Sequence, residues 1–220
     1  MAHPVRRAEV EELQASLDRD IPVSWATNRE PSKRPEARWQ TGRAAWQMHD
    51  PAADWHIVIQ DDAIVSADLL AALEKAVEHI TIEAPMSPYL GTKRPAQQVY
   101  LDLIRQATRR RASWIRGLSI NWGVAIAAPT STIPDMLRWC DTRRTMPYDM
   151  RIGRYYRDHL RVATWYTWPS LVDHRQGPSL VGHGDEGRHA HRHHASSALH
   201  LTWDGPIVDD PRLRGRLRTN

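Results

Sequence analysis

The stretch WHIVIQDDAIVSADLL, residues 55–70, indicates both the fold class and a candidate site. It opens with a nearly continuous apolar run, which is expected of a strand covered on both faces. The run ends in two adjacent carboxylates, Asp61 and Asp62, which are unfavourable beside an interior strand unless positive charge meets them. Ser66 is a candidate N-cap for a following helix, and Asp68 suits its first turn. The predicted buried stripe of that helix has aliphatic side chains at helical spacing: Leu69, Leu70, Leu73, Val77 and Ile80.

Strand-like and helix-like segments alternate along the rest of the chain. Apolar runs or alternating patterns predict strands within 21–26, 54–60, 113–129 and 161–168. Helical periodicity predicts helices at 5–17, 43–49, 66–80, 96–111, 132–140 and 149–159. Polar residues and prolines predict loops at 27–42 and 84–95. This alternation predicts an α/β fold with a mainly parallel sheet flanked by helices.

The two carboxylates lie where such sheets bind ligands, beyond the carboxyl ends of the strands. Mg²⁺ and Mn²⁺ take oxygen ligands and are usually held by one or two carboxylates together with substrate phosphates. A metal at Asp61 and Asp62 would offset their repulsion and stabilise charge on a departing diphosphate. Alternatively, one aspartate is solvated and the other satisfies the backbone of the following turn. The dipeptide alone leaves both interpretations open.

Length and composition favour a globular domain without a membrane span. The 220 residues suit one domain of ordinary size. No stretch approaches the roughly 18 apolar residues of a membrane helix, and the N-terminus MAHPVRRAEVEE has no apolar signal core. We therefore expect a cytoplasmic protein. The single cysteine, Cys140, excludes an internal disulfide and lies in an apolar helical pattern, so we interpret it as a packing residue.

The positive charge is carried almost entirely by arginine. The net charge is +4, and lysine occurs only at positions 33, 75 and 93. Arginine binds phosphate bidentately, which is consistent with a nucleotide or nucleic-acid ligand, although GC-rich coding explains the bias equally well. The segment RQATRRRASWIR, 105–116, mixes arginine with tryptophan as nucleic-acid surfaces do, but cations are also favourable at any helix C-terminus.

Four segments, in order, resemble GT-A fold glycosyltransferases. ADWHIVIQDDAIVSADLLAALEKA is similar to the segment in which an apolar strand ends in a short acidic motif, here Gln60-Asp61-Asp62. HPVRRAEVEEL resembles the first strand-to-helix turn, and INWGVAIAAPTSTIPDML resembles the segment before the acceptor-side helix. MPYDMRIGRYYRDHLRVATWYTWPSLVDHRQGPSLVG resembles the closing segment. The similarity is to the family 25 type and to small phage and actinobacterial glycosyltransferases, over roughly residues 1–185.

The resemblance implies a GT-A-like, Rossmann-like single domain and a set of roles. Asp62, together with Asp61, would bind Mn²⁺ or Mg²⁺ and the diphosphate of a nucleotide sugar, most plausibly a UDP-sugar. His174 and His183 are candidates for a third metal ligand or a diphosphate contact, although either can simply be an exposed loop residue. Asp149 matches the acid that begins the acceptor-side helix, where an inverting enzyme has its general base. A plain helix N-cap explains Asp149 equally well.

A further set of residues is implied to lie near the nucleotide. His3, Pro4, Arg6 and Arg7 would lie near the base. Thr41, Gly42 and Arg43 would open a helix whose N-terminus meets phosphate or ribose, although a plain helix start is an equally good interpretation. Gln60 and Asp61 are also implied to contact the sugar-nucleotide donor. The acidic motif is QDD rather than DxD, which leaves open which aspartate is the direct ligand.

The remainder of the chain, 186–220, reads as a polar segment rich in histidine and arginine. RHAHRHH, 188–194, has no fixed ligand spacing and is interpreted as a flexible surface segment. The acceptor hydroxyl would belong to a modified DNA base, in a phage-encoded enzyme of the bacterial cytoplasm, or to a protein. Two other functions stay open: an arginine-rich nucleic-acid-binding protein without catalysis, and a metal-dependent nucleotidyltransferase that uses the same aspartates.

Overall fold

The predicted strand before the two aspartates forms, at one edge of the main sheet. The computed structural model describes residues 1–28, 30–92, 97–177, 180 and 188–215. Strand β1, Trp55–Ile59, ends one residue before Gln60, and its last two residues are buried. The two aspartates therefore begin the chain reversal that follows the strand, as the sequence predicts.

Six strands form one mixed sheet in the order β1-β5-β3-β6-β4-β8. β1 lies at one edge and pairs with β5 (Ala125–Pro129); the strands that follow in order are β3 (Met86–Ser87), β6 (Thr164–Thr167), β4 (Trp114–Gly117) and β8 (Ile207–Asp209). The prediction of a mainly parallel sheet is wrong, because β5 runs antiparallel to both β1 and β3, and β4 runs antiparallel to β6. The pattern 113–129 is in fact two separate strands, and the link between them, 118–124, has no helix to return the chain in parallel.

The chain start lies alongside β1 and extends this edge of the sheet. The N-terminal amine of Met1 donates to the Ile59 carbonyl oxygen at 2.5 Å. Ala2 forms a parallel bridge with Trp25, so the predicted strand at 21–26 is reduced to this single bridge. The first turn of the chain is thereby held at the carboxyl end of β1.

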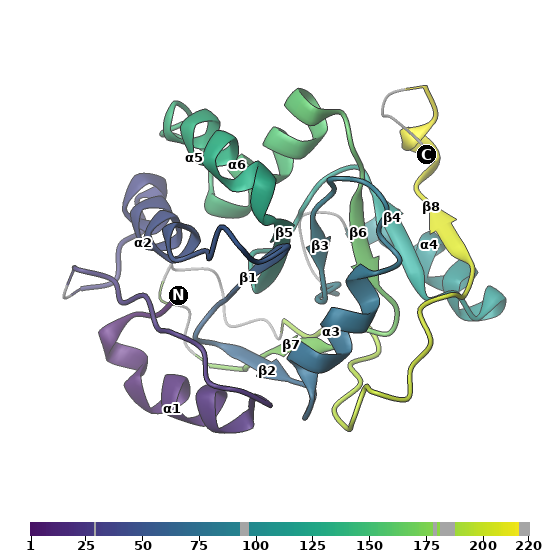
Figure 1. Cartoon of the computed structure of the whole chain (residues 1–220), viewed down its shortest axis with the longest axis horizontal. Coiled ribbons are helices and arrows are strands. Elements are labelled where there is room, and N and C mark those ends of the chain that lie inside the picture. The colour runs from purple at the N-terminus through teal and green to yellow at the C-terminus, as the bar shows by residue number, and fades with distance from the viewer. Residues whose placement is uncertain (29, 93–96, 178–179, 181–187, 216–220) are drawn as a thin grey trace.

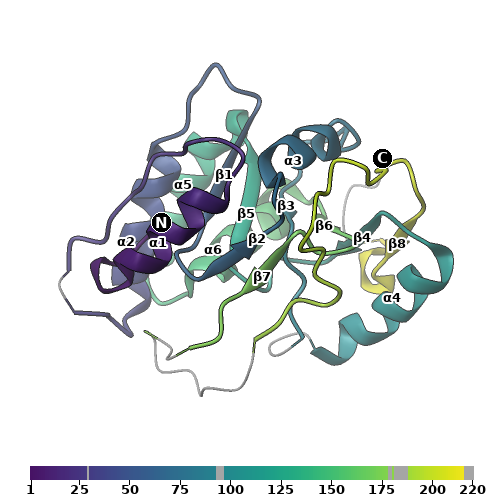
Figure 2. The ribbon, with the colours of Figure 1, turned by 90° about the horizontal axis from the view of Figure 1, so that it is seen from below.

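Helices cover both faces of the sheet (Figures 1 and 2). In Figure 1, α2, α5 and α6 gather on one side of the sheet, α1 and α3 lie on the other, and α4 lies at the β8 edge. The bounds are α1 Arg7–Ser16, α2 Pro35–Gln47, α3 Leu69–Val77, α4 Gln97–Arg110, α5 Ile133–Asp141 and α6 Tyr148–Arg154. Short helical turns are η1 Pro4–Arg6, η2 Thr130–Thr132, the π-helical η3 Tyr155–Leu160 and η4 Pro211–Leu213. None of the helices in the described ranges has the length and apolar character needed to cross a bilayer.

Helix α2 begins well before the predicted position. Residues 27–42 were expected to be a loop, but Pro35 and Glu36 occupy the first turn of α2, where proline and an acid are both favourable. Trp39 and Trp46 lie on its inner face and are fully buried. Burial of these two large side chains favours a helix in a stretch whose local composition favours a loop.

Helix α3 is capped from a distance rather than by Ser66. The Asp18 carboxylate accepts hydrogen bonds from the backbone N–H groups of Leu70 and Ala71 at 2.9 and 2.8 Å. The Ser66 hydroxyl instead donates to the Leu171 carbonyl oxygen at 3.0 Å. The predicted cap is therefore wrong, although the predicted helix forms.

A small second sheet positions the end of the acidic motif. Strand β2, Ala63–Val65, pairs antiparallel with β7, Val172–His174. The register places Ala63 opposite His174, and the backbone N–H of Arg175 donates to the Asp62 carbonyl oxygen at 2.7 Å. Residues more than one hundred positions apart are thus held side by side.

The C-terminal part of the described chain returns to the main sheet. Strand β8 pairs in parallel with β4, and Trp203 and Asp210 nearby are buried. Part of the histidine-rich segment lies along the loop after β3, where His191 N–H donates to the Leu90 carbonyl oxygen at 2.7 Å.

Candidate functional site

Two aspartates and an arginine form a mostly buried charged cluster at the carboxyl end of β1. One guanidinium nitrogen of Arg6, Nη1, lies 3.0 Å from Asp61 Oδ1 and 2.6 Å from Asp62 Oδ2. The backbone N–H of His3 donates to Asp61 Oδ2 at 2.8 Å. The side chains of Arg6, Asp61 and Asp62 are only 13, 10 and 14 % exposed. The positive group that the sequence requires beside the two acids is therefore Arg6.

Strand β7 brings His174 to the other side of Asp62. Its Nε2 lies 3.3 Å from Asp62 Oδ2, and its Nδ1 lies 2.6 Å from the Arg175 carbonyl oxygen. The bond at Nδ1 fixes the orientation of the ring and directs Nε2 at the carboxylate. The structure thus joins the first turn, the acidic motif and the closing segment in one cluster.

The environment separates the pKa values of the two aspartates. Burial disfavours the charged form of Asp62, but His174 and Arg6 outweigh it and lower the Asp62 pKa to about 2. Burial and repulsion from Asp62 raise the pKa of Asp61, with only partial compensation from His3 and Arg6. Asp62 is therefore the firmly ionised member of the pair at neutral pH.

One oxygen of this ionised carboxylate has no protein partner in the described part of the chain. Asp62 Oδ1 is buried and accepts no hydrogen bond there. Buried polar atoms are normally satisfied, so such an oxygen calls for a ligand, an ion or water. No group of three or more His, Cys, Asp or Glu among the described residues is arranged to hold a metal ion. Mg²⁺ and Mn²⁺ do not need one, because substrate phosphates and water commonly complete their coordination.

Tyr148 connects the predicted residues Gln60, Gly42 and Asp149. The Trp46 Nε1–H donates to the Tyr148 hydroxyl at 2.9 Å. A Cβ on Gly42 would meet the Tyr148 ring, and a Cβ on Gly123 would lie 3.0 Å from that ring and 3.1 Å from Gln60 Nε2. Asp149 follows directly in the first turn of α6. Tyr148, which precedes Asp149 in the chain, thus packs near Gly123, as Gln60 does.

Asp149 has the electrostatic character of a base that works near neutral pH. Burial raises its pKa to about 6, and the hydrogen bond from the Met150 backbone N–H, at 2.9 Å, offsets only part of this effect. Such a carboxylate binds protons far more readily than an ordinary aspartate and is still ionised above pH 6. The alternative interpretation of Asp149 as the helix N-cap is wrong, because Pro147 is the N-cap of α6 and Asp149 lies inside its first turn.

Other predicted residues do not join the cluster. Arg7 lies over the ring of Trp25 at 5.0 Å, away from the acids. Thr41, Gly42 and Arg43 were expected to open a helix, but they lie in the middle of α2, where their N–H groups are used within the helix. Arg43 pairs with Asp141 of α5 at 2.9 Å, so it holds two helices together.

The remaining predicted residues are easily placed. Pro4 begins the turn η1 and is exposed, and His3 is the N-cap of that turn and is buried. His183 lies outside the described residues.

Two neighbours of the cluster were not predicted. Asp173 precedes His174, and its Oδ1 accepts from the backbone N–H groups of His174 and Ala190 at 2.8 and 2.5 Å. Tyr89 is buried after β3; burial and the charges of Asp173 and Asp62 raise the pKa of its hydroxyl. The LVDH motif contains Asp173, but nothing in the local sequence singles out Tyr89.

The chain matches no protein-family model and no curated protein sequence.

Proposed function

We propose that this protein is a GT-A-like glycosyltransferase that moves a sugar from a nucleotide diphosphate sugar, namely a UDP-sugar, to an acceptor hydroxyl. The observation that carries the proposal is the cluster of Arg6, Asp61, Asp62 and His174 at the carboxyl end of β1.

The finer fold assignment is supported by convergence of the four segments that resemble this family. Arg6 comes from the first segment and the aspartates from the second. Gly123 of the third lies against Gln60, and the fourth supplies both Asp149 and His174. Segments that resemble a family for independent reasons have no need to meet at one place. Their meeting favours a shared substrate site.

The residues of the cluster fit a divalent metal ion. Asp62 Oδ1 is a buried, unpartnered hard oxygen, and Asp61 and His174 Nε2 lie beside the same carboxyl group. Asp62 Oδ1 would be the direct contact to Mn²⁺ or Mg²⁺, with diphosphate oxygens and water completing the coordination. When bound, the ion would neutralise charge on the diphosphate as it departs.

The chain's own residues account for binding and proton transfer in the proposed reaction. Arg6 supplies fixed positive charge beside the position of the diphosphate. In an inverting reaction, the bond between the sugar anomeric carbon and the diphosphate oxygen breaks as the acceptor oxygen bonds to that carbon. Asp149 takes the proton of the acceptor hydroxyl. The raised Asp149 pKa of about 6 makes this transfer favourable near neutral pH.

The acceptor in this proposal is either a hydroxylated base in DNA or a protein. One observation favours DNA. Four exposed arginines lie in or just after the second half of α4: Arg105, Arg109, Arg110 and Arg111. Arg105 forms an ion pair with Asp102 on the same helix. Exposed arginines can contact phosphates, and binding through them would weaken steeply with salt.

The first test is a thermal-shift screen of nucleotide sugars at pH 7.5, with and without Mn²⁺. A ligand that binds only the folded state raises the melting temperature. At a ligand concentration 100 times Kd, the folded state is stabilised by about 2.7 kcal/mol. We expect a metal-dependent shift with one sugar nucleotide that disappears in Asp62→Asn. Asp204→Asn is the matched control, because Asp204 is exposed. A shift with nucleoside triphosphates alone would favour a nucleotidyltransferase, and a shift with DNA alone would favour a non-catalytic nucleic-acid-binding protein.

A further inference from the structure

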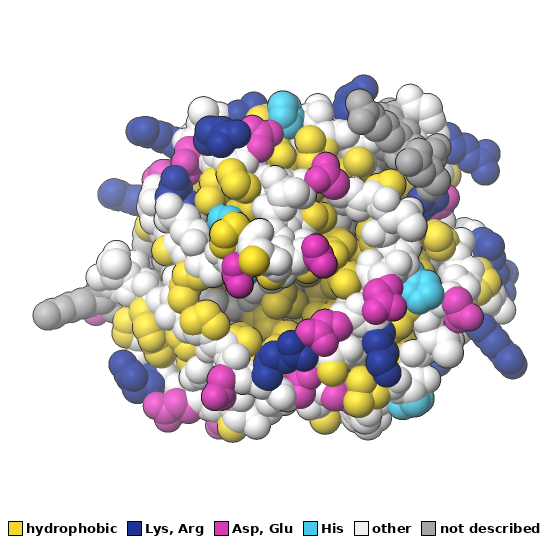
Figure 3. Space-filling view, viewed as in Figure 1, with side chains coloured by type: hydrophobic (Ala, Val, Ile, Leu, Met, Phe, Trp, Pro, Cys, Tyr) yellow, Lys and Arg dark blue, Asp and Glu magenta, His cyan; other side chains and the backbone are white. Residues whose placement is uncertain are grey.

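A second hollow lies on the face of the sheet that α1 and α3 flank. Its volume is about 440 Å³. Figure 3 shows a hollow with an apolar floor near the middle of this face. Its floor includes Ile57, Ala127 and Met86, which are directly opposite one another on β1, β5 and β3. Side chains in such cross-strand positions share one face of a sheet.

In this floor a small residue of β5 lies between two larger residues of the neighbouring strands. Ala127 leaves space between the larger side chains of Ile57 and Met86. The surrounding walls are mainly aliphatic and come from α3, β1, the end of α2 and the segment after α1. They include Leu70, Leu73, Val77, Trp55, Ile59, Met48, Ile21 and Pro22.

Most of the polar side chains that reach the hollow have protein partners of their own. Arg19 and Glu74 pair with each other, with Nη1 and Oε1 2.6 Å apart. His56 Nε2 lies 3.1 Å from the Ala45 carbonyl oxygen, and Asp50 Oδ1 accepts from the Ala52 N–H at 2.9 Å. A ligand that carried its own charge into the hollow would have to break one of these contacts or stay unpaired, which is unfavourable.

The size of the hollow restricts what can fill it. Its volume lies within the range of small-molecule pockets, roughly 300–1,000 Å³. We propose that this hollow binds an uncharged hydrocarbon chain, such as the alkyl or acyl chain of a lipid-like molecule.

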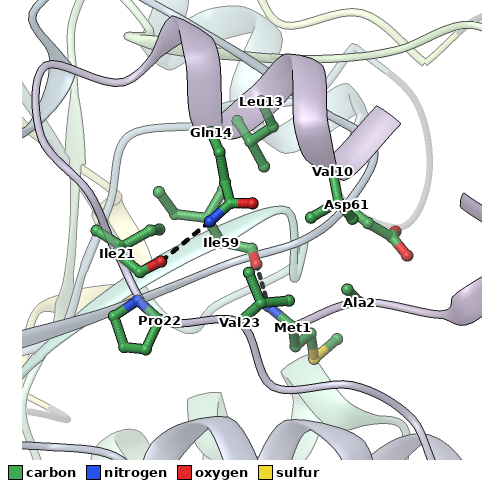
Figure 4. Close-up of a pocket in the computed structure, with 10 residues that line it drawn as sticks. All are labelled: Met1, Ala2, Val10, Leu13, Gln14, Ile21, Pro22, Val23, Ile59 and Asp61. Atoms are coloured by element: carbon green, nitrogen blue, oxygen red, sulfur yellow. Dashed lines mark hydrogen bonds between the residues drawn. The ribbon is translucent and has the colours of Figure 1, made fainter. Parts of the chain in front are cut away.

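The proposed hydrocarbon site adjoins the carboxylate cluster without being part of it. A smaller hollow of about 30 Å³, drawn in Figure 4, shares Met1, Ile21, Pro22 and Ile59 with the larger one and is also lined by Asp61. In Figure 4 the Asp61 carboxylate points away from the aliphatic side chains. The two sites are separate, so hydrocarbon binding does not depend on the proposed glycosyl transfer.

The test is a titration of methyl-labelled protein with 1-decanol, followed by nuclear magnetic resonance. We expect saturable shifts at the methyl groups that line the hollow, including those of Ile57, Leu73 and Val77. 1-Butanol at the same concentration should give much smaller shifts, because it buries less apolar surface. Shifts that do not saturate, or that lie mainly on other surfaces, would overturn the proposal.

Matched substitutions make the test specific. Ala127→Leu fills the floor and should weaken decanol binding at least about tenfold while raising the melting temperature. Ala15→Leu makes the same change on the exposed face of α1 and should leave binding unchanged. If Ala127→Leu does not fold, Val77→Phe on the α3 wall supplies the same comparison. Unchanged decanol affinity in a folded filling variant would overturn the inference.

Discussion

Replacing Asp149 by asparagine should stabilise the protein and stop catalysis at the same time. Burial raises the Asp149 pKa from an ordinary value of 3.8 to about 6. A carboxyl group whose pKa is raised by folding favours the folded state only while it is protonated. The penalty for its charge is therefore almost absent below pH 3.8, grows between pH 3.8 and 6, and is constant above pH 6.

The magnitude follows from the shift in pKa. A shift of about two units corresponds to about 3 kcal/mol at 1.36 kcal/mol per unit. Asp149 is half-buried, so solvent screening reduces this figure, and we expect Asp149→Asn to gain about 1–3 kcal/mol at pH 8. At pH 4 the gain should fall below about 1 kcal/mol, because the wild-type carboxyl is then mostly protonated in the folded state.

Urea unfolding at pH 4 and pH 8 measures the stability effect, with Asp204→Asn as the control for loss of an exposed charge. Sugar transfer by Asp149→Asn should be lost, whereas binding of the sugar nucleotide should persist. The wild-type rate should rise with pH through about 6. A variant that is no more stable than wild type at pH 8, or whose gain is the same at both pH values, would refute the reasoning.

Three further predictions concern the cluster and its support. Arg6→Met should destabilise the protein by about 3–5 kcal/mol, measured by urea unfolding at pH 7.5, because it leaves two mostly buried carboxylates without their shared cation. The control is Arg7→Met, which removes a guanidinium that lies over Trp25 and should lower the free energy of unfolding by no more than about 1 kcal/mol. Asp62→Asn should lower the free energy of unfolding by about 2 kcal/mol at pH 7. The stability difference between wild type and variant should disappear as the pH falls from 3.8 towards 2, the range between the ordinary and the lowered pKa of Asp62. Gly42→Ala should lower stability by about 1–3 kcal/mol and reduce transfer, because the new methyl group meets the ring beside Asp149; unchanged activity would contradict the supporting role of that ring.

The parts of the fold that could be predicted have strong local patterns. The apolar run before the two aspartates forms β1, and the aliphatic stripe that follows forms α3. The alternating residues 161–168 contain β6, Thr164–Thr167. In each case the hydrophobic period agrees with the environment in which the segment is finally buried.

The parts that could not be predicted depend on contacts between distant segments. The direction of β5 is set by its place between β1 and β3, which its alanine-rich sequence does not encode. The early start of α2 depends on burial of Trp39 and Trp46 against the rest of the molecule. Consequently the expected helix N-terminus at Thr41 is absent, and its neighbour Arg43 is an interhelical residue.

Arg6 and His174 were both predicted as residues of the candidate site, but their direct contacts with the two aspartates were not. The unfavourable charge of Asp61 and Asp62 implied a nearby cation, and the first turn supplies it as Arg6. His174 reaches Asp62 because β7 pairs with β2, a contact across more than one hundred residues. Tyr148 connects Gln60 to the start of α6 through packing alone, so no motif could have indicated its role.

The central claim is that Asp62 and its neighbours bind the diphosphate of a nucleotide sugar. The most direct measurement is calorimetric titration of UDP into the protein at pH 7.5 in the presence of Mn²⁺, repeated without the metal and with Asp62→Asn. We predict one saturable site that needs the metal and is lost in the variant, while Asp204→Asn binds as the wild type does. Equal binding by the wild type and Asp62→Asn, or no binding of UDP, GDP or their sugar conjugates by the wild type, would contradict the claim.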